Sequence, residues 1–196
     1  MIKKILAAGV MLAAMQGCGS DSDSAVAAGG SGGGAAVAKG PGATLQCKSS
    51  GKNAFDTYGA AAFVAVNESI VSNVVAELTA HSTANLGDSF TKVGTGMPAS
   101  TTDDMATFKG KLAAFLVYAY GGPESITYTD GKTYVGPQNM VAAHTGLAIT
   151  SDQYDYFITN QVVPALTDNG VPETDVGTCF APIVTDPAFK ASIVGK

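Results

Sequence analysis

The sequence predicts an all-α fold, and three patterns of residues lead to that prediction. Two apolar stripes with helical spacing run through residues 60–79 and residues 102–120. Thr150 and Gln153 form a capping box at the start of a further helix, which we expect over residues 151–167. Because the expected elements are mostly helical and their links are short, helices packed on helices should form the body of the domain.

The first two helices are defined by their apolar residues and by the residues that flank them. In the first helix the apolar positions are Phe63, Val66, Ile70, Val74 and Leu78. In the second they are Met105, Phe108, Leu112, Phe115 and Leu116. Thr102 or Asp103 is expected to cap the second helix, where an acidic group favours the positive end of the helix dipole. Gly121 and Gly122 should end it.

The second half of the domain adds a small hairpin and two more helices. Residues 126–135 are predicted to form a small β-hairpin that turns at Asp130–Gly131, a pair that suits a tight turn. After the helix over residues 151–167, Gly170 and Pro172 separate off a final helix. Pro182 should kink that helix or end it early, because proline donates no backbone hydrogen bond.

The N-terminus carries signals of export. Lys3 and Lys4 precede an apolar run that is too short to cross a bilayer as a helix, so residues 1–17 are typical of an export signal. Met15-Gln16-Gly17-Cys18 resembles a bacterial lipobox. A lipid on Cys18 would then be the protein's only membrane attachment, on the periplasmic or outer-membrane side of the cell envelope. The alternative is a soluble secreted or periplasmic protein with a stray cysteine.

A tether follows, and one domain follows the tether. Residues 18–46 are rich in Gly, Ala and Ser, and they hold too few apolar side chains to offset the entropy of ordering. We expect a flexible tether there and a single domain over residues 47–196. Cys47 and Cys179 could form a disulfide in an oxidising compartment or remain two free thiols.

Charge and histidine content limit the possible partners. The net charge is −5, and all eleven basic residues are lysines, so the chain lacks the basic surface that nucleic-acid binding needs. Only two histidines occur, His81 and His144. A lone histidine cannot form a zinc site, which takes three or four ligands, but a single imidazole is sufficient as the axial ligand of a haem iron. On these residues alone, His144 could equally be a packed or surface side chain.

Four separated motifs resemble, in family order, those of the group 1 truncated haemoglobins. They are Asp103-Asp104-Met105, Gly121-Gly122-Pro123, Met140-x-x-x-His144-x-Gly146 followed by Ile149-Thr150, and Gly170-Val171-Pro172. Residues 55–59 also resemble the opening motif of that family, and the whole resemblance covers about residues 54–194. Relative to the family, the stretch around His81 is an insertion.

The resemblance implies a two-over-two helical sandwich that holds haem b. Because no Cys-x-x-Cys-His occurs, the haem would be held non-covalently. It further implies that His144 is the proximal iron ligand and that Phe90 packs against the haem face. With no arginine present, Lys111 is the best partner for a haem propionate, although it could equally be a solvated helix lysine. The expected cofactor-binding residues are Phe90, Phe108, Lys111, Leu112, Phe115, Met140 and His144.

The aligned distal positions suggest which ligand such a haem would take. They are Val71, Phe108 and Leu112, and none of these side chains donates a hydrogen bond. Bound dioxygen gains from a donor, whereas carbon monoxide and nitric oxide depend on one less. We therefore expect reversible binding of a diatomic gas, with weak affinity for oxygen, or a redox haem. His81 could be a sixth ligand in the absence of gas, or simply a solvated side chain.

Two other functions remain open at this point. The same domain could be an enzyme that converts nitric oxide or reduces peroxide, which requires an electron donor, and the chain carries no flavin or nicotinamide motif. Alternatively, the protein could be an interaction lipoprotein that keeps the globin shape without haem.

Overall fold

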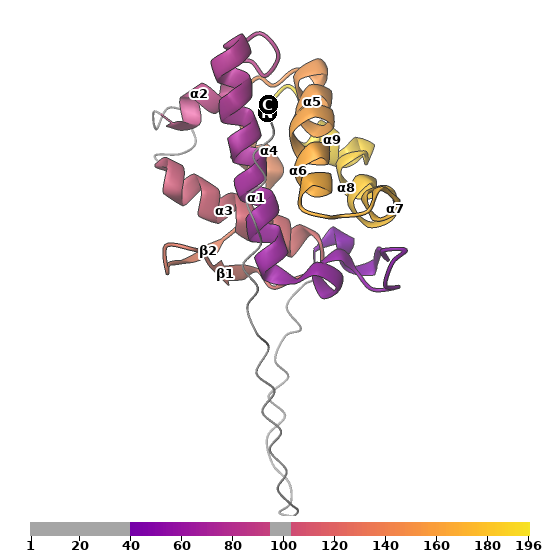
Figure 1. Ribbon diagram of the computed structural model, residues 1–196. Coiled ribbons are helices and arrows are strands. Elements are labelled where there is room, and N and C mark those ends of the chain that lie inside the picture. The colour runs from indigo at the N-terminus through magenta and orange to yellow at the C-terminus, as the bar shows by residue number, and fades with distance from the viewer. Residues whose placement is uncertain (1–39, 95–102) are drawn as a thin grey trace, which may run out of the picture. The chain divides into compact units, whose positions relative to one another are not determined.

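The computed structural model describes residues 40–94 and 103–196, and it is mostly helical, with 62% helix and 4% strand (Figure 1). This confirms the predicted helical class. The export signal, Cys18, the tether up to residue 39 and the cap candidate Thr102 lie outside the described residues.

The long helix α1, Ala54–His81, carries much of the core. The Asn53 side chain caps it by accepting the backbone N–H of Asp56 at 2.7 Å. Gly59, with a φ of 74°, leaves the helical path, so a short first turn precedes the long straight part. His81 was expected beyond the first helix, in an insertion, but it is the last residue of this helix, and its Nδ1 lies 3.0 Å from Glu77 Oε1.

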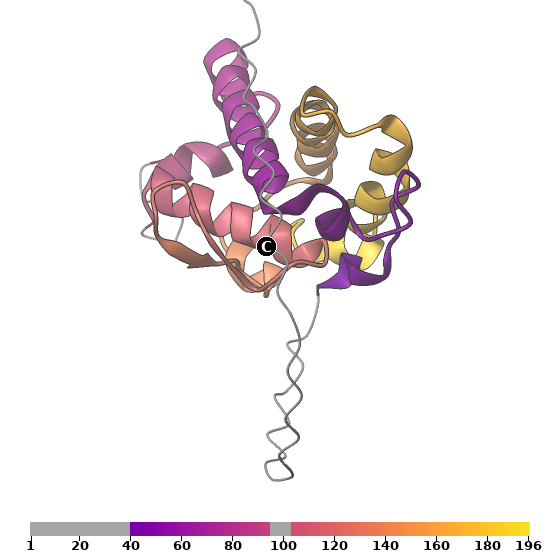
Figure 2. The same ribbon diagram turned by 60° about the horizontal axis from the view of Figure 1, so that its bottom comes forward.

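Helices α2, Ser89–Gly94, and α3, Met105–Ala119, follow, and α3 crosses close to α1 (Figure 2). The cap of α3 is Asp104, whose side chain accepts the backbone N–H of Thr107 at 2.7 Å. The predicted caps Thr102 and Asp103 were therefore wrong, because the first unpaired N–H groups lie one residue further on. Gly121, with a φ of 100°, follows the end of α3 as the glycine pattern predicted.

The predicted hairpin is confirmed. Strands β1, Ser125–Thr127, and β2, Thr133–Val135, pair antiparallel with Ile126 opposite Tyr134. The hairpin packs on α3, where a Cβ at Gly110 would lie only 2.4 Å from the Tyr134 ring. Gly110 is therefore required for this close approach between helix and hairpin.

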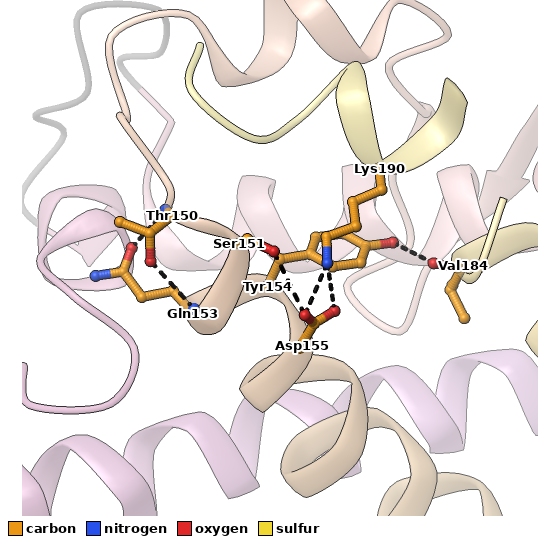
Figure 3. A network of polar contacts seen from close by, with 7 residues as sticks. All are labelled: Thr150, Ser151, Gln153, Tyr154, Asp155, Val184 and Lys190. Atoms are coloured by element: carbon orange, nitrogen blue, oxygen red, sulfur yellow. Dashed lines mark hydrogen bonds and ion pairs between the residues drawn. The ribbon is translucent and has the colours of Figure 1, made fainter. Parts of the chain in front are cut away.

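A short helix and a longer interrupted one come next. Helix α4 spans Met140–His144. Helices α5, Ser151–Phe157, and α6, Val163–Asp168, are joined by the π-helical turn η2, Ile158–Val162. The predicted capping box starts α5: the Gln153 N–H donates to Thr150 Oγ1 at 3.2 Å, and the Thr150 N–H donates to Gln153 Oε1 at 2.9 Å (Figure 3).

The chain ends in four short helical pieces: α7, Glu173–Asp175; the π-helical turn η3, Val176–Phe180; α8, Ala181–Val184; and α9, Pro187–Ala191. The early end predicted from Pro182 is confirmed, because α8 stops at Val184. Pro164 and Pro182 are each the second residue after a π-helical turn. A proline ring crowds the carbonyl four residues before it, and the wider π turn relieves that crowding.

The predicted disulfide also forms, between Cys47 and Cys179, with a Cα–Cα separation of 4.8 Å. It joins the N-terminal strap, residues 40–53, to η3. Part of this strap was assigned to the flexible tether, but Pro41–Thr44 forms the 3₁₀ helix η1 and Gly42 is buried. The described fold therefore includes residues 40–46.

Removing this disulfide should destabilise the fold strongly. The bond closes a loop with a sequence separation of 132, so the double variant Cys47→Ser/Cys179→Ser should lose about 5 kcal/mol of unfolding free energy by the loop-entropy model. Urea unfolding of the variant and of the oxidised and reduced wild type measures this loss. A change below about 1 kcal/mol would contradict it.

Candidate functional site

The described helices enclose a cavity of about 340 Å³, within the range of about 300–1,000 Å³ typical of small-molecule sites. Its walls come from α1, α2, α3, α4, α5 with η2, and the C-terminal pieces of the chain. Phe63, Val66 and Ile70 line it from α1, at the spacing of one helix face. The apolar stripe that predicted this helix therefore faces the cavity as well as the core.

The structure brings the seven residues predicted to bind a cofactor together around this cavity. They are Phe90, Phe108, Lys111, Leu112, Phe115, Met140 and His144. Val71, predicted at the distal position, lines instead an adjoining void of about 40 Å³ that it shares with Phe108 and Leu112. His81 does not line the cavity, and its side chain is 56% exposed.

His144 is the last residue of α4, and its ring lines the cavity. The Asn139 side chain caps this short helix, and His144 Nδ1 lies 2.8 Å from the carbonyl oxygen of Met140, one turn earlier. Because a carbonyl oxygen only accepts, Nδ1 must carry the proton of this bond, and the lone pair of the neutral ring is on Nε2. Burial lowers the pKa of His144, so the ring is neutral at neutral pH.

Two tyrosines missed by the sequence analysis also line the cavity. Tyr120 donates its hydroxyl to the carbonyl oxygen of Phe180 at 3.2 Å. Tyr154 donates to that of Val184 at 2.7 Å, as Figure 3 shows. Both hydroxyl protons are therefore committed to the backbone. The helical spacing of Leu112 and Leu116 on α3 and of Tyr120 at its C-cap was the signal that could have identified Tyr120.

Aromatic contacts join the cavity walls to one another. Phe90 stacks on Phe157 with ring centroids 5.3 Å apart, and Phe115 stacks on Phe189 at 6.3 Å. These pairs join α2 to α5 and α3 to α9. Each pair crosses between elements that are distant in sequence, so sequence periodicity could assign each ring to a helix face but not to its partner.

The C-terminal segment, residues 187–196, closes the cavity near α4. Phe189 and Ile193 line it, and Ile193 packs in one apolar cluster with Met140 and Tyr154. Lys190 reaches over the Tyr154 ring, with Nζ 5.4 Å from the ring centroid, to the carboxylate of Asp155 at 2.7 Å (Figure 3). The sequence analysis did not assign this segment to the site.

Backbone bonds complete that closure. The N–H of Ala148 donates to the carbonyl of Lys196 at 2.7 Å, and the N–H of Gly195 donates to that of Ile149 at 2.9 Å. These two bonds fasten the end of the chain to the link between α4 and α5. The position of His144 is thus supported from the C-terminal side.

One ion pair stands among these apolar walls. Lys111 Nζ donates to both carboxylate oxygens of Asp103, at 2.9 and 2.6 Å, and both residues line the cavity. The side chains are 44% and 18% exposed, respectively, so the pair is partly open to solvent. The Lys111 ammonium is therefore paired with a carboxylate and only partly exposed to solvent.

Within residues 40–94 and 103–196, no three metal-ligating side chains gather at one place. An iron in this cavity would therefore depend on His144 alone and on a cofactor that supplies the remaining ligands. Comparison of the chain with protein-family models, curated proteins and solved structures found no match.

The low pKa of His144 should make the haem-free protein sensitive to mild acid. Its folded pKa lies below the unfolded value of about 6.5, so the stability that the neutral ring allows is present above that pH and is lost as pH falls through the folded pKa. Unfolding free energy of the wild type should therefore drop as pH falls from about 7 into the mildly acid range.

The variant His144→Met should show a smaller drop over the same interval, as measured by urea unfolding at each pH. The carboxylates with lowered pKa values, such as Asp175, contribute mainly at lower pH, below about 4.5. Equal slopes for the wild type and His144→Met would rule out His144 as the source.

Proposed function

We propose that this protein is a haem-binding globin of the truncated, two-over-two kind that reversibly binds a diatomic gas at the bacterial envelope. The observation that supports this most is His144, a single neutral imidazole in the wall of an apolar cavity of ligand size. Its Nδ1 is fixed by the Met140 carbonyl, and a backbone carbonyl is a usual orienting partner of metal-ligating histidines.

The residues present fit a non-covalent haem b. His144 Nε2 would hold the iron, and the rings of Phe90, Phe108 and Phe115 would contact the macrocycle and exclude water. Lys111, a cation in the cavity wall, would meet a propionate. When bound, the haem would supply an iron that can take a diatomic gas.

The cavity walls favour a gas that needs no hydrogen-bond donor. Phe108 and Leu112 are apolar, and the hydroxyls of Tyr120 and Tyr154 already donate to carbonyls. Dioxygen would lose a charge-assisted hydrogen bond worth about 1.5–3 kcal/mol, or about one to two powers of ten in affinity. We therefore favour nitric oxide, carbon monoxide or weakly held oxygen as the ligand.

An envelope location agrees with the disulfide. Disulfides persist in oxidising compartments and are rare in the cytosol, and Cys47–Cys179 is buried in the domain. Together with the lipobox-like Met15-Gln16-Gly17-Cys18, this supports a lipid-anchored protein outside the cytoplasm.

The direct test is the visible spectrum of the full chain purified with haem supplied. A Soret band at about one haem per chain is expected, and His144→Ala should remove it, because the iron loses its only protein ligand. His81→Ala is the matched control and should keep the band. A colourless wild type would refute the proposal and favour a haem-free interaction protein, and a band that survives His144→Ala would refute the ligand assignment.

A donor introduced at Leu112 should change gas selectivity. In Leu112→Gln the side-chain amide can donate to bound dioxygen, so oxygen affinity should rise about 10- to 100-fold, with a smaller effect on carbon monoxide. Equilibrium titration of both gases on the ferrous protein measures the ratio. A parallel rise for both gases would instead indicate a change in access to the iron.

A further inference from the structure

Lys111 in the cavity wall is already paired with the carboxylate of Asp103. Of the described residues lining the cavity, Asp103 is the one carboxylic acid and Lys111 the one amine. Both oxygens of Asp103 lie within 2.9 Å of Lys111 Nζ. A ligand's acid group that approaches Lys111 must therefore displace this carboxylate or share the ammonium with it, and the like charges of the two acids oppose sharing.

From this we infer that Asp103 is a built-in competitor for Lys111, and that the cavity takes an apolar ligand carrying an acid group. Where that ligand is haem, with its two propionates, the inference rests on the proposed function. Asp103 then speeds ligand release by offering Lys111 an alternative partner. Lys111 slows release by holding the acid group, so the two residues of one ion pair have opposite effects on the bound state.

A purely structural role for the pair predicts something different. Lys111 lies on α3, and Asp103 directly precedes the N-cap of that helix. If the pair only fastened the start of α3 to the cavity wall, loss of either partner would loosen the same contact. Both variants would then release ligand faster, and the sign of the Asp103 effect separates the two roles.

The test measures haem release from the reconstituted full chain into an excess of a haem-scavenging apoprotein. Asp103→Asn should release haem about two- to fivefold more slowly than the wild type, and Lys111→Met about two- to fivefold faster, as expected for partly exposed charge pairs. The double variant should behave like Lys111→Met, because without the Lys111 ammonium there is no cation for which Asp103 and the ligand's acid group compete. Faster release from Asp103→Asn would overturn the inference.

Two controls confine the effect to the ligand's acid group. Iron protoporphyrin dimethyl ester has no propionate charge, so all these variants should release it at nearly the same rate. Lys109 also lies on α3, and its Nζ is 2.7 Å from Oε2 of Glu68 on α1. Lys109→Met breaks this ion pair, and neither of its partners lines the cavity. It should leave haem release unchanged. Differences that persist with the ester would contradict the inference.

A probe without iron separates this inference from the proposed function. Anilinonaphthalene sulfonate is apolar and anionic, and its fluorescence reports binding to the haem-free protein. Asp103→Asn should bind it about two- to fivefold more tightly and Lys111→Met correspondingly more weakly. If the wild type takes no haem but these shifts appear, the haem proposal fails and the competition stands. If haem binds and no shifts of opposite sign appear with either ligand, the competition alone fails.

Discussion

The fold depends most on the strap that holds two walls of the cavity together. At Gly42 the strap comes so close to α3 that a Cβ there would lie 2.7 Å from the Ala119 carbonyl oxygen. The Cys47–Cys179 disulfide then ties the strap to η3, and the next residue, Phe180, lines the cavity. The covalent bond therefore limits how far the η3 wall can move from α3.

Sequence patterns could predict the local elements and the faces of the helices, but not the way in which they meet. The stripe on α3, the capping box at Thr150 and the hairpin turn are encoded within a few residues, so each was predicted correctly. The closing role of Phe189 and Ile193 depends on contacts with residues tens of positions away. The π-helical turns before Pro164 and Pro182 were missed because a proline predicts only a disruption, whereas packing decides which form it takes.

The candidate site shows the same division. The residues Phe108, Leu112 and Phe115 follow helical spacing, so the face they share could be predicted from the amino-acid sequence alone. That Val71 lies in the adjoining void could not, because its place depends on the crossing of α1 over α3. The hydrogen bond that orients His144 is local, with its acceptor one turn earlier, but burial of the ring requires the C-terminal segment and α3. The geometry of the imidazole is thus set by α4, and its protonation state by tertiary packing.

The positions of Lys111 and His144 in the cavity wall favour one orientation of an amphipathic ligand. An isolated charge costs several kcal/mol to bury among apolar walls, so an acid group has to stay at Lys111 and the solvent beyond it. A metal centre, by contrast, would need the lone pair of His144, and burial lowers the pKa of that ring, so the lone pair stays available to lower pH. Lys111 and His144 would therefore contact different parts of one ligand. A molecule that satisfied both would be apolar, with an acid group at its edge and a group at its centre that binds the Nε2 lone pair, and under the proposed function that molecule is haem.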